Sequence, residues 1–252
     1  MRIGLCCKSD TWDLAERLGF DYIELPLNWV ASMDEPSFQE LLEESGRHTV
    51  KARRMNLLYP KTMNLFSVDP EEERSYLDKG FSRMRQLGAT LVVFGSGKSR
   101  RVPDGMPLGE AVKVLARHTR LACQVAQDYG ISIALEPLNK AETNVLTTVC
   151  EGAYFAALVD KPNFGVLADM FHMTKEHEDW NDIGMVGRLM HAHIATRDTR
   201  GYPVDANDPD VTAFLAQLRA IGYQGDLSIE GKTDDAERDG KAALAVLRQI
   251  NG

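Results

Sequence analysis

The 252-residue sequence lacks the features that define several large classes of protein. It has no apolar run near the roughly 20 residues that cross a membrane, and its first residues show no signal-peptide pattern. Its four cysteines, Cys6, Cys7, Cys123 and Cys150, have neither the spacing of a disulfide framework nor that of a zinc knuckle. These absences predict a cytoplasmic protein with reduced thiols and no membrane partner.

Positive charge is also scarce. The formal net charge is −8 at pH 7, and Lys98–Arg101 is the one dense basic stretch. This charge balance argues against a protein that binds nucleic acids or anionic lipid surfaces electrostatically. We therefore expect a small molecule as the binding partner, and no nucleic acid.

What the sequence does contain is an unbroken alternation of apolar, strand-length segments with amphipathic, helix-length ones. The apolar segments are short and aliphatic, as is typical of parallel strands that are buried on both faces. They lie at Ile3–Cys7, Tyr22–Leu27, Ala52–Leu58, Thr90–Gly95, Ile131–Glu136, Gly165–Asp169, His191–Ala195 and Leu227–Glu230. Helices are expected at Pro107–Tyr129, at Asp235–Ile250 and at Asp208–Ile221, where Asp208 can cap the helix before Pro209.

Eight strands alternating with eight helices predict a single (β/α)8 TIM barrel, an α/β fold, over residues 1–252. The length agrees, because such a barrel typically needs about 250 residues. The main alternative is a doubly wound open sheet, which often binds its ligand through a glycine-rich turn after the first strand. Here Cys6–Asp10 follow the first strand and contain no glycine. The barrel is therefore the favoured fold.

Four of the expected strands end in a side chain that can bind a metal. These residues are Glu136, Asp169, His193 and Glu230, on the fifth to eighth strands. Because the C-terminal ends of barrel strands form the active face, the four should converge at one side of its mouth. Carboxylate and imidazole ligands without thiolate suit a divalent ion such as Mn²⁺, Co²⁺, Mg²⁺ or Zn²⁺.

Each of these residues alone also has a structural explanation. Glu136 could form a salt bridge, and Asp169 could cap a turn. Glu230 could be a solvated strand end, and His193, like His191, could be a core histidine bonded to the backbone. Their occurrence at four successive strand ends favours the metal site. A metal-binding imidazole needs a partner for its other ring nitrogen, so we expect one for His193.

The motifs around these residues resemble those of the xylose isomerase-like TIM barrels, and most of all the ketose 3-epimerases among them. The resemblance covers the second half of the chain well and rests on Leu135–Asn139, Asp169–Met173, His191–His193 and Ser228–Glu230. It implies that the four residues bind one divalent ion, and that Glu136 and Glu230 also act as acid and base. It further implies a sugar substrate and a homo-oligomer, either a dimer or a tetramer.

Two more positions match residues with which the ketose 3-epimerases bind substrate. Glu142 stands six residues after Glu136, where those enzymes have an acid, and His172 stands three after Asp169, where they have a histidine. An exposed loop acid and a packed imidazole are the structural alternatives. The matching metal motifs favour substrate binding for both.

The region after His193 departs from the epimerase pattern. Thr196 and Thr199 replace an acid and a substrate-binding arginine of those enzymes. Arg197 or Arg200 would have to supply the missing guanidinium group, and we expect Arg200 to contact the substrate. The identity of the sugar is therefore open.

These residues together predict an isomerase that epimerises a ketose or keto-sugar derivative beside its carbonyl. The reaction removes a C–H proton and returns one to the opposite face, through an enediolate that a divalent ion stabilises as a Lewis acid. Glu136 and Glu230 could alternate as base and acid.

Three other functions fit the same barrel less well. A metal-dependent lyase that dehydrates inososes or dehydroshikimate-type acids is the nearest of them. An abasic-site endonuclease would need a cluster of zinc ions with extra histidines, and the chain has six histidines and a negative charge. A non-catalytic sugar-binding barrel would not need all four metal-binding residues.

The segment Phe94–Gly105, which follows the fourth strand, combines glycines with basic residues. Its backbone amides and side chains could bind a phosphate or a carboxylate, although it lacks the spacing of a P-loop. A flexible surface turn explains the segment equally well. Trp12, Trp29, Tyr59 and Phe66 could line the pocket or belong to the core.

Overall fold

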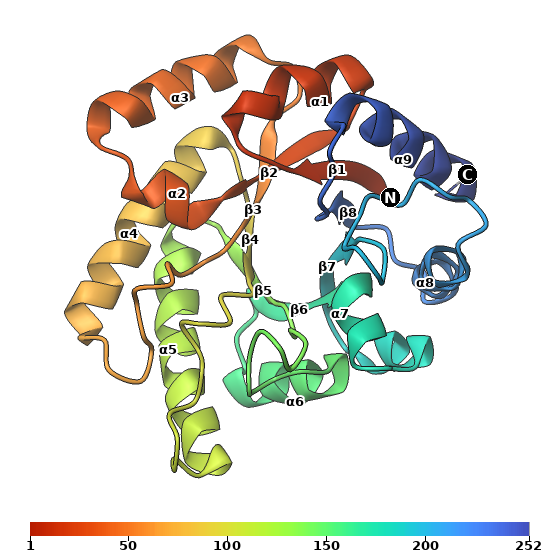
Figure 1. Ribbon diagram of the computed structural model, residues 1–252. Helices are drawn as coiled ribbons and strands as arrows, with labels where there is room; N and C mark the ends of the chain where they lie inside the picture. The colour runs from red at the N-terminus through yellow and green to blue at the C-terminus, as the bar shows by residue number, and fades with distance from the viewer. Residues whose placement is uncertain (252) are drawn as a thin grey trace.

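The computed structural model describes residues 1–251, and the side chains of residues 1–250. Eight parallel strands close into a barrel in the order β1 to β8, with β1 paired to β8. The strands are β1 (Arg2–Cys6), β2 (Tyr22–Pro26), β3 (Ala52–Asn56), β4 (Leu91–Phe94), β5 (Ser132–Leu135), β6 (Phe164–Asp169), β7 (Leu189–Ile194) and β8 (Asp226–Ile229). Figure 1 shows the helices around this barrel, and the predicted (β/α)8 fold is confirmed.

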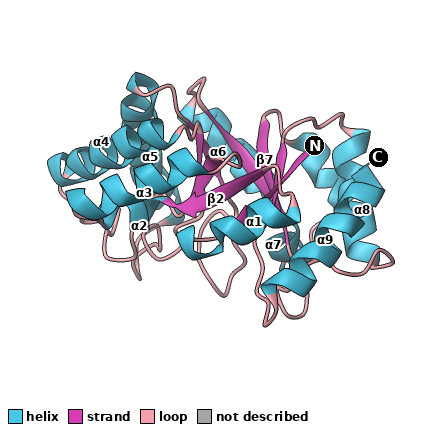
Figure 2. Ribbon diagram, turned by 90° about the horizontal axis from the view of Figure 1, so that it is seen from above, coloured by secondary structure: helices cyan, strands magenta, loops and turns pink. Residues whose placement is uncertain are grey.

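The helices cover the outside of the barrel, as the turned view in Figure 2 also shows. They are α1 (Trp12–Leu18), α2 (Leu27–Ser32), α3 (Glu35–Arg47), α4 (Pro70–Leu87), α5 (Leu108–Asp128), α6 (Val149–Val159), α7 (Met170–Lys175), α8 (Pro209–Ala220) and α9 (Ala236–Asn251). Short 3₁₀ helices lie at η1 (Ser9–Thr11) and η2 (Trp180–Met185). No helix among the described residues is long and apolar enough to cross a membrane.

The expected pattern of one helix per strand is wrong at β2, which is followed by both α2 and α3. A second helix start signal explains the break. The side chain of Asp34 accepts a hydrogen bond from the backbone N–H of Ser37 at 2.9 Å, and Pro36 lies in the first turn of α3. The predicted cap of α8 is confirmed, because the side chain of Asp208 accepts from the backbone of Asp210 and Val211.

Alternation along the strands decides which side chains face the inside of the barrel. Leu91, Val93, Ala134 and Leu167, on β4, β5 and β6, form a small buried cluster separate from the large core between strands and helices. Side chains of a strand alternate between its two faces. Glu136 lies two residues after Ala134, so it points to the same side as this cluster. Strand geometry thus carries a carboxylate to the mouth of the barrel.

Gly165, the second residue of β6, has no room for a side chain. A Cβ atom there would lie 2.6 Å from Met190 Cγ and 2.7 Å from the carbonyl oxygen of Arg188. We expect Gly165→Ala to lower the free energy of unfolding by about 1–3 kcal/mol, because a backbone carbonyl cannot move aside cheaply. Urea unfolding measures this change. Gly187→Ala is the control, because nothing lies within 4 Å of its Cβ position, and an equal loss in both variants would contradict the prediction.

Candidate active site

Four side chains from consecutive strands meet at the mouth of the barrel. Glu136, Asp169, His193 and Glu230 each offer one ligand atom, and these atoms all lie within 4.8 Å of one another. Asp169 is the last residue of β6 and His193 lies in β7, whereas Glu136 and Glu230 directly follow β5 and β8. The structure therefore brings together the four residues that the sequence places at strand ends.

The nitrogen His193 Nδ1 lies at the centre of this group. It is 3.4 Å from Glu136 Oε1, 3.6 Å from Glu230 Oε2 and 3.8 Å from Asp169 Oδ2. His193 Nδ1, Glu136 Oε1 and Asp169 Oδ2 are all buried and have no hydrogen-bond partner. Buried polar atoms are normally paired, so three unpaired ones that face each other need a common partner. A divalent cation fits this donor set, which combines carboxylate oxygens with an imidazole nitrogen.

Glu24, in β2, was not predicted as a site residue, and it holds the far side of the His193 ring. It is fully buried, and its carboxylate lies 3.0 Å from His193 Nε2, 2.8 Å from His191 Nε2 and 2.6 Å from Ser228 Oγ. A donor at His193 Nε2 leaves the lone pair of Nδ1 free to face the other three ligands. The partner expected for His193 is therefore present. The signal in the sequence was an acid in the middle of the apolar strand Tyr22–Pro26.

The charges in this site separate the acidities of its two glutamates. Burial, followed by the negative charge of Glu230, raises the pKa of Glu136. Burial also disfavours ionisation of Glu230, but the positive charges of His193 and Arg200 outweigh it and lower its pKa to about 2. One carboxyl group thus holds its proton more readily than the other. An acid/base pair needs this asymmetry.

Protons and cations compete for the same place in this cluster. Burial alone would keep His193 neutral, but the carboxylate of Glu24 and the other nearby acids raise its pKa well above the usual value. A metal ion would replace that proton, because a ligating imidazole must be neutral. The arrangement is a candidate cation site in which a proton on His193 occupies the position that an ion would take.

His172 points a single N–H group toward the same cluster. The backbone N–H of Asn139 donates to His172 Nδ1 at 3.1 Å, so the ring carries its proton on Nε2. That Nε2 is buried, has no hydrogen-bond partner and lies 3.9 Å from Glu136 Oε1. The Asn139 side chain also donates to Glu142 Oε1 at 3.2 Å. The two residues expected to contact substrate are therefore linked through Asn139.

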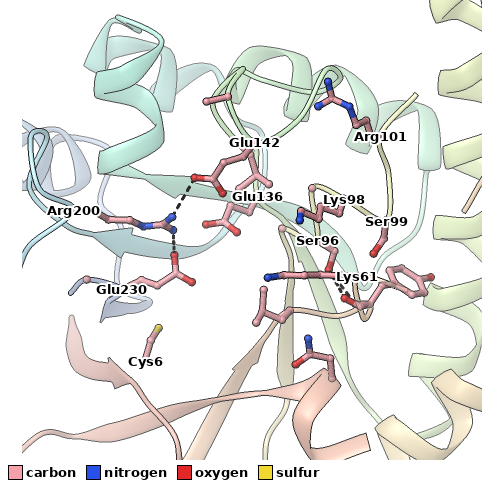
Figure 3. A pocket seen from close by; sticks show the side chains of 18 of the residues that line it. Cys6, Lys61, Ser96, Lys98, Ser99, Arg101, Glu136, Glu142, Arg200 and Glu230 are labelled. Carbon is pink, nitrogen blue, oxygen red and sulfur yellow. Dashed lines mark hydrogen bonds and ion pairs between the residues drawn. The ribbon is translucent and has the colours of Figure 1, made fainter. Parts of the chain in front are cut away.

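Arg200 enters the site, as the sequence predicts, whereas Arg197 does not. Its guanidinium group lies 2.5 Å from Glu230 Oε2 and 3.2 Å from Glu142 Oε1 (Figure 3). It also lies over the ring of Phe171. Arg197 pairs with Asp210 at 2.9 Å instead. Arg200 therefore brings a guanidinium group to the mouth of the barrel, although Thr199 stands where the ketose 3-epimerases have their arginine.

A cavity of about 880 Å³ opens above the cluster. Glu136, Glu142, Arg200 and Glu230 line one part of it (Figure 3). Its volume lies near the upper end of the usual range for ligand pockets, about 300–1,000 Å³. Tyr59 lines the cavity, as one of the aromatic side chains considered for this role. Trp12 instead lies fully buried in the outer core, where its indole N–H donates to the carbonyl oxygen of Val50.

Comparison with known proteins agrees with this geometry. The sequence matches the family described as Xylose isomerase-like TIM barrel over residues 12–250. It is 30% identical over 228 residues to an L-ribulose 3-epimerase of Methylomonas sp. strain DH-1, which covers 86% of this chain and 75% of that protein. It is 36% identical over 223 residues to a D-psicose 3-epimerase of Agrobacterium fabrum strain C58, which covers 85% of this chain and 75% of that one.

The fold agrees as well. The solved structure of a D-allulose 3-epimerase from Methylomonas sp., in complex with D-allulose, matches with a TM-score of 0.86 at 22% identity. The match covers 99% of this chain and 97% of that one. The resemblance inferred from the strand-end motifs is thereby confirmed. The chain belongs to the xylose isomerase-like TIM barrel family and is an enzyme of the isomerase class.

Proposed function

We propose that this protein is a divalent-metal-dependent ketose 3-epimerase. The observation that carries the proposal is the set of three buried, unpaired atoms, His193 Nδ1, Glu136 Oε1 and Asp169 Oδ2, which face one another beside Glu230. The curated relatives named above are 3-epimerases of ketoses, which agrees with this set. Glu136, Asp169, His193 and Glu230 would hold one ion, such as Mn²⁺, Co²⁺, Mg²⁺ or Zn²⁺.

The chain's own carboxylates move the proton. An ion held there acts as a Lewis acid that stabilises negative charge next to the reacting carbon. Glu136 and Glu230 come from β5 and β8 and so reach the cavity from different strands. One takes the proton from the carbon beside the carbonyl, and the other returns a proton to the opposite face.

Three further residues orient the sugar in this proposal. His172 donates its Nε2–H to a substrate oxygen, since that group is buried and unpaired beside Glu136. Glu142 and Arg200 line the cavity above and bind substrate hydroxyl groups. Arg200 also fixes the carboxylate of Glu230 through their ion pair. These contacts hold the reacting carbon between the two glutamates.

Metal removal tests the proposal directly. The protein is stripped with EDTA, reloaded with Mn²⁺, Co²⁺, Mg²⁺ or Zn²⁺, and incubated with ketoses in D₂O. We expect deuterium at the carbon beside the carbonyl only after reloading, with one ion per chain by elemental analysis. The proposal fails if no ketose exchanges while an ion is bound. Loss of water, seen by mass spectrometry, would identify a lyase, and several ions per chain would favour the endonuclease.

A further inference from the structure

The cavity wall opposite the acidic cluster is positively charged. Lys61, in the loop after β3, and Lys98, in the loop after β4, both line the cavity, as does Arg101, whereas Lys232 lines it from the side of Glu230. None of these four has a carboxylate within ion-pair distance in the part of the chain that the structure describes. The chain has a net charge of −8, so acids are abundant elsewhere on it. Two lysines that project into one cavity make its potential locally positive, which favours a negative ligand there.

The loop that carries Lys98 is held in place by buried packing and hydrogen bonds. The side chain of Arg100 is completely buried and donates to the backbone carbonyls of Phe94, at 3.0 Å, and Glu136, at 2.7 Å. Gly95 has no space for a side chain, since its Cβ would lie 2.2 Å from Glu136 Oε2. The loop is thus packed against a metal-binding glutamate. This packing excludes the flexible surface turn that the sequence left open.

The same loop presents backbone donors beside its lysine. Residues 96–99 form a turn in which the N–H of Ser99 donates to the carbonyl of Ser96 at 3.0 Å. No acceptor within residues 1–251 binds the N–H groups of Gly97 and Lys98, at the tip of this turn. Consecutive free N–H groups in a turn can bind an anion. The hydroxyl of Ser99 donates to the carbonyl of Pro60, so the turn is joined to the loop that carries Lys61.

Figure 3 shows how the two lysines lie. The ammonium groups of Lys61 and Lys98 point into the cavity from the side facing Glu136, while Arg200 and Glu230 lie across from them. One cavity therefore contains an acidic end for proton transfer and a basic end. A single molecule that fills both ends must carry a ketose at one end and a negative group at the other.

We propose that the substrate is an anionic ketose, with a terminal phosphate or carboxylate bound by Lys61, Lys98 and the N–H groups of residues 97 and 98. This rests on the proposed epimerase function and specifies its substrate class. A neutral sugar would gain no charge pairing from the two solvent-exposed ammonium groups. An anionic sugar matches them and is also drawn toward this end by their field.

Three sugars that differ only at C6 test the proposal: D-fructose, D-fructose 6-phosphate and D-fructuronate. Deuterium exchange at the carbon beside the carbonyl is measured with the metal-loaded full chain. We expect kcat/KM for at least one of the two anions to exceed that of D-fructose by about 10-fold or more, and this result identifies phosphate or carboxylate. The double variant K61Q/K98Q should lose about 100-fold for the preferred anion and less than twofold for D-fructose. Lys113→Gln, on the exposed face of α5, is the control and should change neither.

Binding measured by calorimetry separates this proposal from the epimerase function. D-fructose 6-phosphate and D-fructuronate are titrated into the wild type and into K61Q/K98Q. If no ketose exchanges but an anion binds and the double variant weakens it about 100-fold, the anion site stands and the epimerase function fails. If D-fructose exchanges as fast as both anions and K61Q/K98Q changes nothing, the anion site is overturned and the epimerase function stands.

Discussion

Replacing Glu136 or Glu230 with glutamine should lower the rate of epimerisation by about 10³-fold or more. General acid/base groups contribute roughly 10²–10⁴-fold each, and an amide can neither accept nor return the proton at neutral pH. Both residues belong to the cluster and line the cavity, so each is placed to reach the substrate directly. The rate is measured by following the conversion of one ketose epimer into the other.

The two variants should differ from each other in a second measurement. If the glutamates serve opposite faces of the carbon, each removes the proton of one epimer only. Glu136→Gln should then still exchange deuterium into one epimer, and Glu230→Gln into the other, although neither interconverts them. A site with one base would lose exchange of both epimers in the same variant. Nuclear magnetic resonance of each epimer in D₂O separates these outcomes.

Metal content must be measured alongside, because both glutamates are also proposed ligands. The assays are run at saturating Mn²⁺, with bound ion determined for each variant. Glu110→Gln, an exposed acid in the first turn of α5, is the matched control and should keep full activity. A Glu136 or Glu230 variant that binds the ion and keeps more than about a tenth of the activity would contradict the acid/base assignment.

Replacing Glu24 with glutamine should weaken metal binding by about 10–100-fold, although Glu24 is not itself one of the four proposed ligands. The carboxylate lies against two imidazoles and a hydroxyl. The amide offers a single acceptor oxygen, and its N–H₂ group would face a donor. The His193 ring is then no longer held in the tautomer that presents Nδ1. Calorimetric titration with Mn²⁺ measures this change.

The same substitution should lower the free energy of unfolding by about 1–3 kcal/mol, because a buried donor is left unpaired. Glu73→Gln separates the two effects. Glu73 is also completely buried, and it lies 2.6 Å from His118 Nδ1 and accepts from Tyr59 OH at 2.7 Å, away from the four ligands. Its variant should lose stability and keep its metal affinity. Unchanged metal affinity in Glu24→Gln would show that Glu24 acts on stability alone.

The fold and the shared location of the site residues could be predicted because both follow from local patterns. Alternation of strands and helices determines the barrel, and the barrel brings all strand ends to one face. Asp169 and His193 lie at the ends of the neighbouring strands β6 and β7. They are therefore close together for any conformation of the loops that follow. The sequence could not predict that His193 Nδ1, Glu136 Oε1 and Asp169 Oδ2 lack hydrogen-bond partners, because this depends on the positions of all neighbouring atoms.

Contacts between strands far apart in the sequence could not be predicted in the same way. Glu24 precedes His193 by 169 residues, and only closure of the barrel brings them to 3.0 Å. Lys61 follows β3 in a segment with no recognisable motif, so its place on the same side of the cavity as Lys98 requires the folded loops. Arg200 was one of two candidates because a loop backbone, here with a positive φ of 52°, decides where its side chain points.

Because the barrel is closed, metal affinity should depend on whether both halves of the chain are folded. The proposed ligands all come from β5 to β8, but the carboxylate that orients His193 comes from β2, in the first half of the chain. An ion that requires this orientation binds the complete barrel more tightly than a state in which only the second half is ordered. By mass action it therefore stabilises both halves together, and partly folded forms become rarer as the ion concentration rises.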